Sequence, residues 1–164
     1  LEAILAIWTT DPVAYESPDF TIPPSVIGPK PVQSPHPPIY MAAYTEAAMA
    51  RVARFADGWM PVGVPIEGMT AMLQGIRQMA EGHGRDPNAL ELIVRANLHV
   101  TDAPLGDDRF IFTGSMDQIR GDVAAARAAG ASELTFDVTF DPAVTTVDHF
   151  LAGLDIWWEV GQTA

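Results

Sequence analysis

Residues 39–62 read IYMAAYTEAAMARVARFADGWMPV, and this stretch decides the fold. Residues 39–43 are a short apolar run of the kind that forms a buried strand. Over residues 45–56 the apolar side chains recur at helical spacing on one face, and the two arginines lie off that face. Residues 58–62 are a second short apolar run. A strand, a helix and another strand in this order predict a βαβ unit, with parallel strands and a right-handed crossover.

The same alternation continues to the end of the chain. An apolar stripe predicts a helix over about 66–81, which ends at Gly82-His83-Gly84. The later elements are a third strand over 91–100, a loop over 101–112, a helix from Ser115 to about 129, a fourth strand over 133–140 and a closing helix with its stripe at 147–158. Strands that alternate with helices indicate the α/β class and a parallel sheet.

The first 38 residues precede this alternation. Apolar side chains at positions 1, 4, 5 and 8 predict a helix within residues 1–12. Residues 13–38 hold eight of the 14 prolines and predict a long extended loop, with room for a short strand near Val26-Ile27. We expect one domain over residues 1–164, in which residues 39–164 form four βα units.

The length of the four units is informative. A complete eight-stranded (β/α)8 barrel needs about 250 residues. Residues 39–164 are 126 residues, which matches about four units and therefore half a barrel. A small open doubly wound sheet fits the same count, so both architectures stay open at this point.

The composition excludes several classes of function. Nine Lys and Arg stand against 21 Asp and Glu, a net charge of −12, which argues against nucleic acid and anionic membrane surfaces. No apolar run approaches the roughly 18 residues of a membrane span. Cysteine is absent and the four histidines lack ligand spacing, so we expect no metal site. No secretory signal opens the chain, and a cytoplasmic enzyme is the expectation.

Three stretches carry a resemblance to a known family. Residues 29–43 read PKPVQSPHPPIYMAA and run into a helix that ends in Ala-Asp-Gly-Trp at 56–59. Phe112-Thr-Gly-Ser115 is followed by Gln118-Ile119, and residues 133–137 read ELTFD. These stretches resemble the bacterial luciferase-like oxidoreductases, and the block over 29–59 is the most specific part. The resemblance covers nearly the whole chain and implies the C-terminal half of a (β/α)8 TIM barrel, with four parallel strands and intervening helices.

The resemblance also implies a chemistry. Such enzymes use a flavin or deazaflavin coenzyme, FMN or F420, for hydride transfer in monooxygenase or dehydrogenase reactions on small organic substrates. The family places its acids and bases largely in the strands of the other half, so no catalytic residue is named here. The Ala42-Ala43 pair resembles the strand end of some deazaflavin-using members.

The strand end Ala42-Ala43-Tyr44-Thr45 is the first candidate cofactor site. Small side chains let backbone N–H groups approach an anion, and the N-terminus of the following helix favours negative charge. Many family members carry Gly-Gly where this chain has the two alanines, and Tyr44 is larger than the usual residue. The structural alternative is a buried strand end followed by an ordinary N-cap at Thr45.

Two further features follow from the pattern. Val62-Gly63 follows the second strand, where the family's loop often lines the cofactor; a plain turn is the alternative. Polar residues alternate along the third strand (Arg95, Asn97, His99) and the fourth (Thr135, Asp137, Thr139), and they should face the barrel interior. We predict a buried Arg95–Asp137 ion pair with a structural role. Ser115 and Gln118 form a capping-box pattern, which explains both residues without a ligand.

Two functions are therefore considered. One is a luciferase-like oxidoreductase, of which this chain is a C-terminal half that lacks most of the active site. The other is a non-catalytic half-barrel that forms a homodimer or docks with a separate N-terminal half, because a half-barrel leaves sheet edges and an interior uncovered. A chain with no function of its own is a third possibility.

Overall fold

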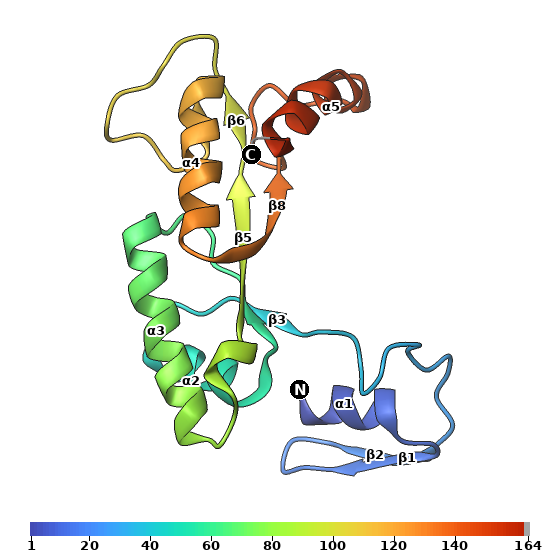
Figure 1. Cartoon of the computed structure of the whole chain (residues 1–164). Helices are drawn as coiled ribbons and strands as arrows, with labels where there is room; N and C mark the ends of the chain where they lie inside the picture. Colours follow the sequence, from blue (N-terminus) through green and yellow to red (C-terminus); the bar gives the residue numbers. More distant parts are fainter. Residues whose placement is uncertain (163–164) are drawn as a thin grey trace. The chain divides into compact units, whose positions relative to one another are not determined.

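A computed structural model describes residues 1–162 (Figure 1). The chain divides into two compact units, Leu1–Ile39 and Tyr40–Ala164, and each is described by itself. None of the helices in the described part is both long and apolar enough to cross a membrane.

The first unit is a helix and a hairpin. Its elements are α1 (Glu2–Thr9), β1 (Val13–Glu16) and β2 (Thr21–Ser25), and the two strands pair antiparallel. The Lys30 ammonium donates to the carbonyl oxygens of Ile7 at 2.6 Å and Thr10 at 2.7 Å. A cation on these last carbonyls stabilises the C-terminal end of α1, which agrees with the helix predicted within residues 1–12.

The prediction of a loop over 13–38 is wrong for residues 13–25, which form the hairpin. Ser17 makes the turn, because its backbone N–H and hydroxyl both donate to the carbonyl of Phe20 and its hydroxyl accepts from the N–H of Phe20. The prolines at 23 and 24 are tolerated because β2 is an edge strand of a two-stranded sheet. The short strand suggested near Val26-Ile27 is found directly before these residues, because β2 ends at Ser25 and Val26 is exposed.

The second unit has a four-stranded parallel sheet in the order β3-β4-β5-β8. Each strand is followed by a helix, as half a barrel requires. In chain order the elements are β3 (Tyr40–Met41), α2 (Glu46–Phe55), β4 (Gly58–Trp59), α3 (Ile66–Gly82), the 3-10 helix η1 (Pro87–Ala89), β5 (Glu91–Asn97), β6 (His99–Val100), β7 (Thr113–Gly114), α4 (Met116–Ala128), β8 (Ala131–Asp137) and α5 (Val147–Gly161).

The core of this unit lies between one face of the sheet and the helices. Trp59, Leu92, Val94 and Ala96 from the strands are fully or almost fully buried, together with apolar residues of α2, α3 and α4 (Val52, Ala53, Leu73, Ile76, Ile119, Val123). Alternate residues of β5 therefore point to the helices, and the intervening polar residues from Arg95 onward occupy the other face. The polar residues of β5 that were predicted to face the barrel interior therefore lie on the face of the sheet opposite the helices.

The strands differ from their predicted lengths for local reasons. The strand β4 ends at Trp59, because Pro61 has no N–H to donate to a neighbouring strand. Val62 still forms an isolated β-bridge with Arg95. The predicted strand 91–100 is interrupted at Leu98, whose N–H turns to the carbonyl of Asp137 at 2.9 Å. Beyond this interruption β6 pairs with β7, a two-residue strand that lies between the predicted loop over 101–112 and the predicted helix start at Ser115.

Candidate functional site

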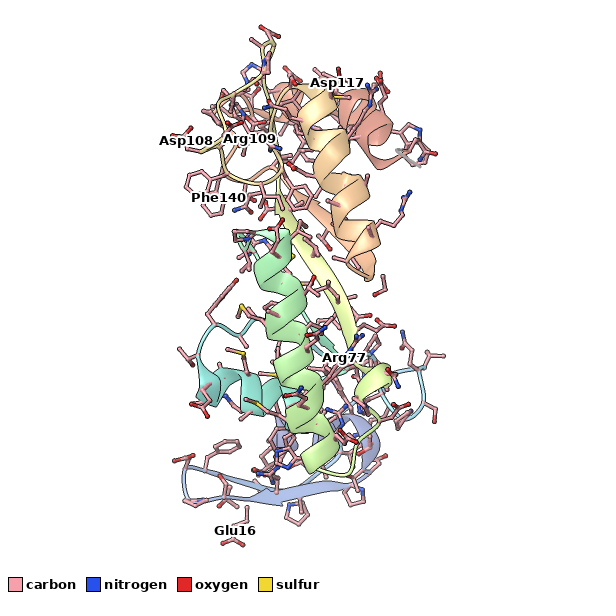
Figure 2. The ribbon with its side chains drawn as sticks, turned by 60° about the vertical axis from the view of Figure 1, so that its left-hand side comes forward. Glu16, Arg77, Asp108, Arg109, Asp117 and Phe140 are labelled. Atoms are coloured by element: carbon pink, nitrogen blue, oxygen red, sulfur yellow. The ribbon has the colours of Figure 1, made fainter. Side chains whose placement is uncertain are left out.

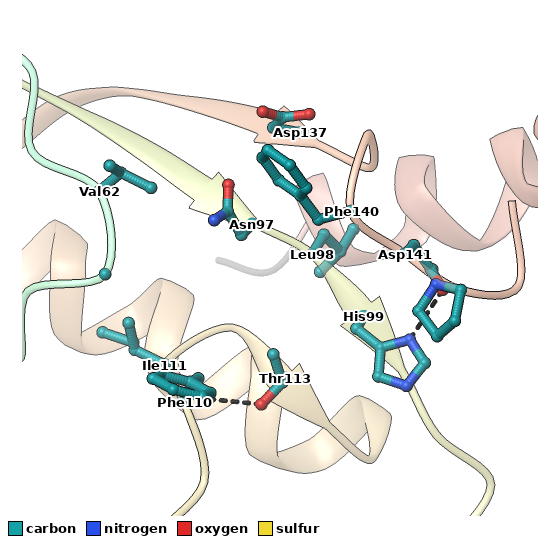
Figure 3. Close-up of a pocket in the computed structure, with 12 residues that line it drawn as sticks. Val62, Asn97, Leu98, His99, Phe110, Ile111, Thr113, Asp137, Phe140 and Asp141 are labelled. Carbon is teal, nitrogen blue, oxygen red and sulfur yellow. Dashed lines mark hydrogen bonds and ion pairs between the residues drawn. The ribbon is translucent and has the colours of Figure 1, made fainter.

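A cavity lies where the strands of the second unit end (Figure 3). Its volume is about 430 Å³. The lining comes from the segment after β4, from the ends of β5 and β8, from β6 and β7, from the loop before β7 and from the chain just beyond β8: Val62, Gly63, Asn97, Leu98, His99, Phe110, Ile111, Thr113, Asp137, Phe140, Asp141 and Pro142. In parallel α/β folds, ligands bind at this carboxyl-terminal edge of the strands.

Two aromatic rings stand out among the apolar walls of the cavity. Phe110 is 79% exposed and Phe140 is 72% exposed, which is unusual for side chains of this size. Figure 2 shows Phe140 and Arg109, the neighbour of Phe110, at the same end of the unit. Together with Leu98 and Ile111, these rings give the cavity walls that suit a flat, largely apolar molecule.

Asn97 supplies an unpaired acceptor inside this apolar surrounding. Its side-chain Oδ1 is buried and accepts no hydrogen bond from any described residue. A buried polar oxygen without a partner destabilises the chain, so it calls for an explanation by function or by a bound group. A ligand that presents an N–H or O–H would satisfy this oxygen once the Asn97 side chain turns it toward the cavity.

The predicted Arg95–Asp137 pair is confirmed across β5 and β8, where the Arg95 Nε donates to Asp137 Oδ2 at 2.7 Å. The prediction that the pair is buried is wrong for Arg95, whose side chain is 41% exposed, because this face of the sheet is not covered by the second unit. Hydrogen bonds from the Thr139 hydroxyl and backbone N–H, with a further contribution from Arg95, lower the pKa of Asp137 to about 2.

His99 and Asp141 form a second pair at the cavity wall. The His99 Nδ1 lies 2.8 Å from Asp141 Oδ1 (Figure 3). The Asp141 side chain is only 6% exposed, and its Oδ1 also accepts from the backbone N–H of Ala143 at 2.9 Å. A carboxylate held in this way fixes the orientation of the imidazole ring.

The predicted cofactor residues are brought together only in part. Val62 and Gly63 line the cavity, and Gly63 has φ +66°, which a glycine adopts without strain. The Tyr44 hydroxyl accepts from the backbone N–H of Val62 at 3.0 Å, so both predicted segments meet there. None of residues 42–45 belongs to the cavity lining.

The strand end 42–45 itself is built into the fold. Ala43 is buried, and its carbonyl accepts from the Trp59 indole N–H at 3.0 Å. The Thr45 hydroxyl caps α2 by accepting from the N–H of Ala48 at 3.3 Å, as the structural alternative predicts. A hydroxyl that accepts one hydrogen bond keeps its own hydrogen for donation, so this cap leaves room for a ligand contact.

The loop 101–112 is fixed beside the cavity by a network that the sequence analysis missed. Arg109 makes a two-pronged contact with Asp122, at 2.6 and 2.8 Å, and Asp122 also accepts from the backbone N–H of Phe112 at 2.7 Å. The hydrogen bond with Asp122 raises the pKa of Arg109. The predicted capping box of Ser115 and Gln118 is confirmed, and the Gln118 amide also binds both backbone groups of Leu105.

Some residues of the cavity could be predicted from the sequence, and others could not. Asn97 and His99 belong to the predicted alternation of inward polar residues. Phe110, Phe140 and Asp141 lie in irregular segments, where no periodicity reports which way a side chain points. Within the described residues, no group of three or more His, Asp or Glu side chains is arranged to hold a metal ion.

The fold and the cavity define a barrel-type α/β protein whose site lies at the strand ends. The family model described as luciferase-like monooxygenase matches residues 1–105. The chain belongs to this family, which confirms the resemblance read from the sequence.

Two similar sequences show how much of a relative the chain spans. The FMNH(2)-dependent dimethylsulfone monooxygenase of Pseudomonas putida is 30% identical over 84 residues, which are 51% of this chain and 23% of the relative. An uncharacterised protein of Mycobacterium tuberculosis is 42% identical over 89 residues, 52% of this chain and 30% of the relative. The match thus spans less than a third of the length of either protein.

Solved structures confirm the fold class. The coenzyme F420-dependent tetrahydromethanopterin reductase from Methanopyrus kandleri superposes with a TM-score of 0.70 at 13% identity, over 86% of this chain and 56% of that one. An F420-dependent secondary alcohol dehydrogenase gives 0.69 at 14% identity, over 94% and 56%. A riboflavin lyase with modified FMN gives 0.62 at 14% identity, over 93% and 49%. The chain has four parallel strands with their helices and corresponds to about half of such TIM-barrel enzymes.

Proposed function

We propose that this chain provides a coenzyme-binding part of a luciferase-like oxidoreductase that uses a flavin or deazaflavin, FMN or F420. The observation that carries the proposal is the unpaired Oδ1 of Asn97 in an apolar cavity at the strand ends. The family membership supports the same chemical class. The reaction, as a monooxygenase or a dehydrogenase, belongs to the whole enzyme.

The residues of the cavity fit the ring system of either coenzyme. Flavin and deazaflavin rings are flat and largely apolar, and their pyrimidine edge carries an N–H. The aromatic and aliphatic walls formed by Phe110, Ile111 and Phe140 suit the faces of such a ring. The Asn97 Oδ1 provides an acceptor for the edge N–H. When bound, the coenzyme supplies the hydride-transferring centre, and the protein orients it and excludes water.

The polar tail of the coenzyme has a separate proposed place at Ala42, Ala43, Tyr44 and Thr45, next to Val62 and Gly63. Ala42 is exposed and small beside the start of α2, and the Thr45 hydroxyl retains a hydrogen to donate to a phosphate oxygen. The hydrogen bond from Val62 to Tyr44 ties this strand end to a residue of the cavity wall. The relatives and neighbours include proteins named for FMNH(2), FMN and F420, so both coenzymes are candidates.

The exposed side chains of the cavity favour a partner for this half-barrel. Phe110 and Phe140 are more than two thirds exposed, and exposed rings at a binding edge are typical of surfaces that another element covers. We propose that an N-terminal half-barrel, or a second copy of this chain in a homodimer, covers them. A chain that only assembles in this way, without binding a coenzyme, is the alternative function. We also propose a cytoplasmic location for the whole oxidoreductase.

The test is a fluorescence titration of the purified chain with F420 and, separately, with FMN, with light scattering on the same samples. The chain has two asparagines, which gives a matched pair of variants. Asn97→Leu removes the cavity acceptor, whereas Asn88→Leu changes an exposed residue of η1. We expect saturable binding of one coenzyme, weakened about tenfold by Asn97→Leu and unchanged by Asn88→Leu.

Other outcomes would contradict the proposal in different ways. A folded chain that binds neither coenzyme, with the mass of a dimer, would favour the assembly alternative. Binding that Asn97→Leu leaves intact would remove Asn97 from the site. The thermal stability of Asn97→Leu should equal or exceed that of the wild-type chain, because the substitution removes a buried oxygen without a partner.

A further inference from the structure

The His99–Asp141 pair has features that a purely structural contact would not need. Asp141 is the only acidic or otherwise polar residue that is buried among the described residues. Two N–H groups hold its carboxylate: the His99 ring at 2.8 Å and the Ala143 backbone at 2.9 Å. The imidazole that it orients lines the cavity and keeps 32% of its side chain exposed.

The contact with Asp141 determines which ring nitrogen of His99 is free to react. A carboxylate accepts a hydrogen bond, so the neutral ring carries its hydrogen on Nδ1. Nε2 then has a lone pair, and no described residue forms a hydrogen bond with it. The other carboxylate that lines the cavity, Asp137, is paired with Arg95 and held by Thr139. His99 is therefore the group of this cavity that is placed to accept or give a proton.

We propose that His99 is a catalytic residue that moves a proton to or from a substrate oxygen in this cavity, with Asp141 as its positioning residue. The substrate class is a small, mainly apolar molecule with one hydroxyl or carbonyl group, because the remaining walls are largely apolar. This inference rests on the proposed oxidoreductase function.

The proton transfer can be written in full for a hydroxyl. The O–H bond of the substrate breaks, its electron pair stays on oxygen, and the proton forms an N–H bond with Nε2. The ring becomes an imidazolium, whose positive charge faces the Asp141 carboxylate through the Nδ1–H. In the reverse direction the same Nε2–H protonates a substrate oxygen as it gains negative charge.

The test is ¹⁵N NMR of the histidine rings in the full chain without coenzyme, at a fixed pH at which His99 is neutral. We expect a His99 ring protonated on Nδ1, with an Nε2 resonance that shifts saturably when benzyl alcohol is added. Toluene, which has the same ring but no hydroxyl, should leave Nε2 unshifted. His149, which is exposed and contacts Thr145, serves as an internal control.

Two variants separate the roles of the pair. Asp141→Ala should shift the His99 ring toward the Nε2–H form that free histidine favours, which blocks the acceptor. His99→Gln should abolish the alcohol-dependent shifts of neighbouring cavity residues, whereas His149→Gln should leave them unchanged. The wild-type spectra alone remain decisive if the Asp141 variant does not fold.

A wild-type ring protonated on Nε2, or an equal response to benzyl alcohol and toluene, would overturn the proposal. These measurements contain no coenzyme. A failure here accompanied by saturable F420 or FMN binding therefore rejects the role of His99 and leaves the proposed function standing. The opposite pattern rejects the coenzyme site and leaves the proton-transferring pair.

Discussion

The Tyr44 hydroxyl binds both backbone polar groups of Val62: it accepts from the N–H at 3.0 Å and approaches the carbonyl oxygen at 3.4 Å. One side chain thus ties the segment after β3 to the segment after β4. Val62 also lines the cavity, so this link connects the proposed site for the coenzyme tail with the proposed site for its ring.

Tyr44→Phe should loosen this link while keeping the ring. We expect a loss of about 1 kcal/mol in unfolding free energy and a drop of about 2–4 °C in Tm, because the Val62 N–H loses its acceptor. Coenzyme affinity should fall with it. Thermal unfolding and the fluorescence titration measure the two effects.

Tyr40→Phe is the matched control for this prediction. Tyr40 lies in β3, four residues before Tyr44, and its hydroxyl donates to Glu91 at 3.1 Å in an exposed contact at the start of β5. We expect unchanged coenzyme affinity in this variant. Equal losses in the two variants would mean that the Tyr44 link has no special relation to the site.

Asp137 makes stability depend on pH in the acid range. Its pKa is about 2 in the folded chain, lowered from 3.8 chiefly by hydrogen bonds from Thr139 and further by Arg95. A lowered folded-state pKa gives stability that is fully present above the unfolded value, near pH 4, and is lost as the pH falls toward 2. Asp137→Asn should therefore be less stable than the wild-type chain by about 1.5 kcal/mol at pH 7.

Urea unfolding at several pH values between 7 and 2 tests this prediction. The difference between wild type and Asp137→Asn should shrink below pH 4. Asp117→Asn is the control, since that side chain is 94% exposed and its ion pair with Arg120 lies on the surface. A difference that stays constant down to pH 2 would show that the carboxylate of Asp137 does not carry the effect.

The Arg95–Asp137 pair also shows what the sequence could predict. Polar residues alternated on two apolar strands, and the period of two places such residues on one face of neighbouring strands. Apolar side chains at helical spacing predicted α2 and α3, a capping-box pattern marked the start of α4, and apolar runs predicted the four strands of the main sheet. The burial of Arg95 was not predictable, because it depends on what covers the inner face and not on the local pattern.

The parts that the sequence did not reveal depend on single contacts and not on a repeated pattern. His99 and Asp141 are 42 positions apart, and Asp141 lies in a turn after β8 where no periodic pattern operates. The β1–β2 hairpin depends on the hydrogen bonds of Ser17, although the prolines nearby suggested an open loop. Propensity and periodicity describe whole stretches of chain, whereas each of these features is decided by one particular contact.

Asp122 should control the order of the loop that carries Phe110. Asp122→Ala removes the partner of Arg109 and the acceptor of the Phe112 N–H together, and both side chains of the ion pair are largely buried. We expect a loss of about 2–3 kcal/mol in stability. Hydrogen exchange should show lost protection of the Phe112 amide. Asp107→Ala, an exposed position in the same loop, is the control, and equal exchange in both variants would contradict the role of Asp122.

Replacement by alanine of two glycines, one before and one after the N-terminus of α4, should change the stability of the chain in opposite directions. Gly114 has φ +127°, and a Cβ there would lie 2.4 Å from the Gln118 side-chain oxygen. That oxygen accepts from the N–H groups of Ser115 and Leu105, so Gly114→Ala strains the backbone and displaces the cap. Gly121 lies inside α4, and a Cβ added there meets nothing within 4 Å.

We expect Gly114→Ala to lower the unfolding free energy by about 2 kcal/mol and Gly121→Ala to raise it by about 0.5–1 kcal/mol. Urea unfolding of the two variants measures both effects. Because Gln118 also holds Leu105 in the cavity-side loop, Gly114→Ala should weaken coenzyme binding as well, whereas Gly121→Ala should not. A Gly114→Ala chain as stable as the wild type would mean that the Gln118 side chain moves aside freely, and the cap would then have no part in holding the loop at the cavity.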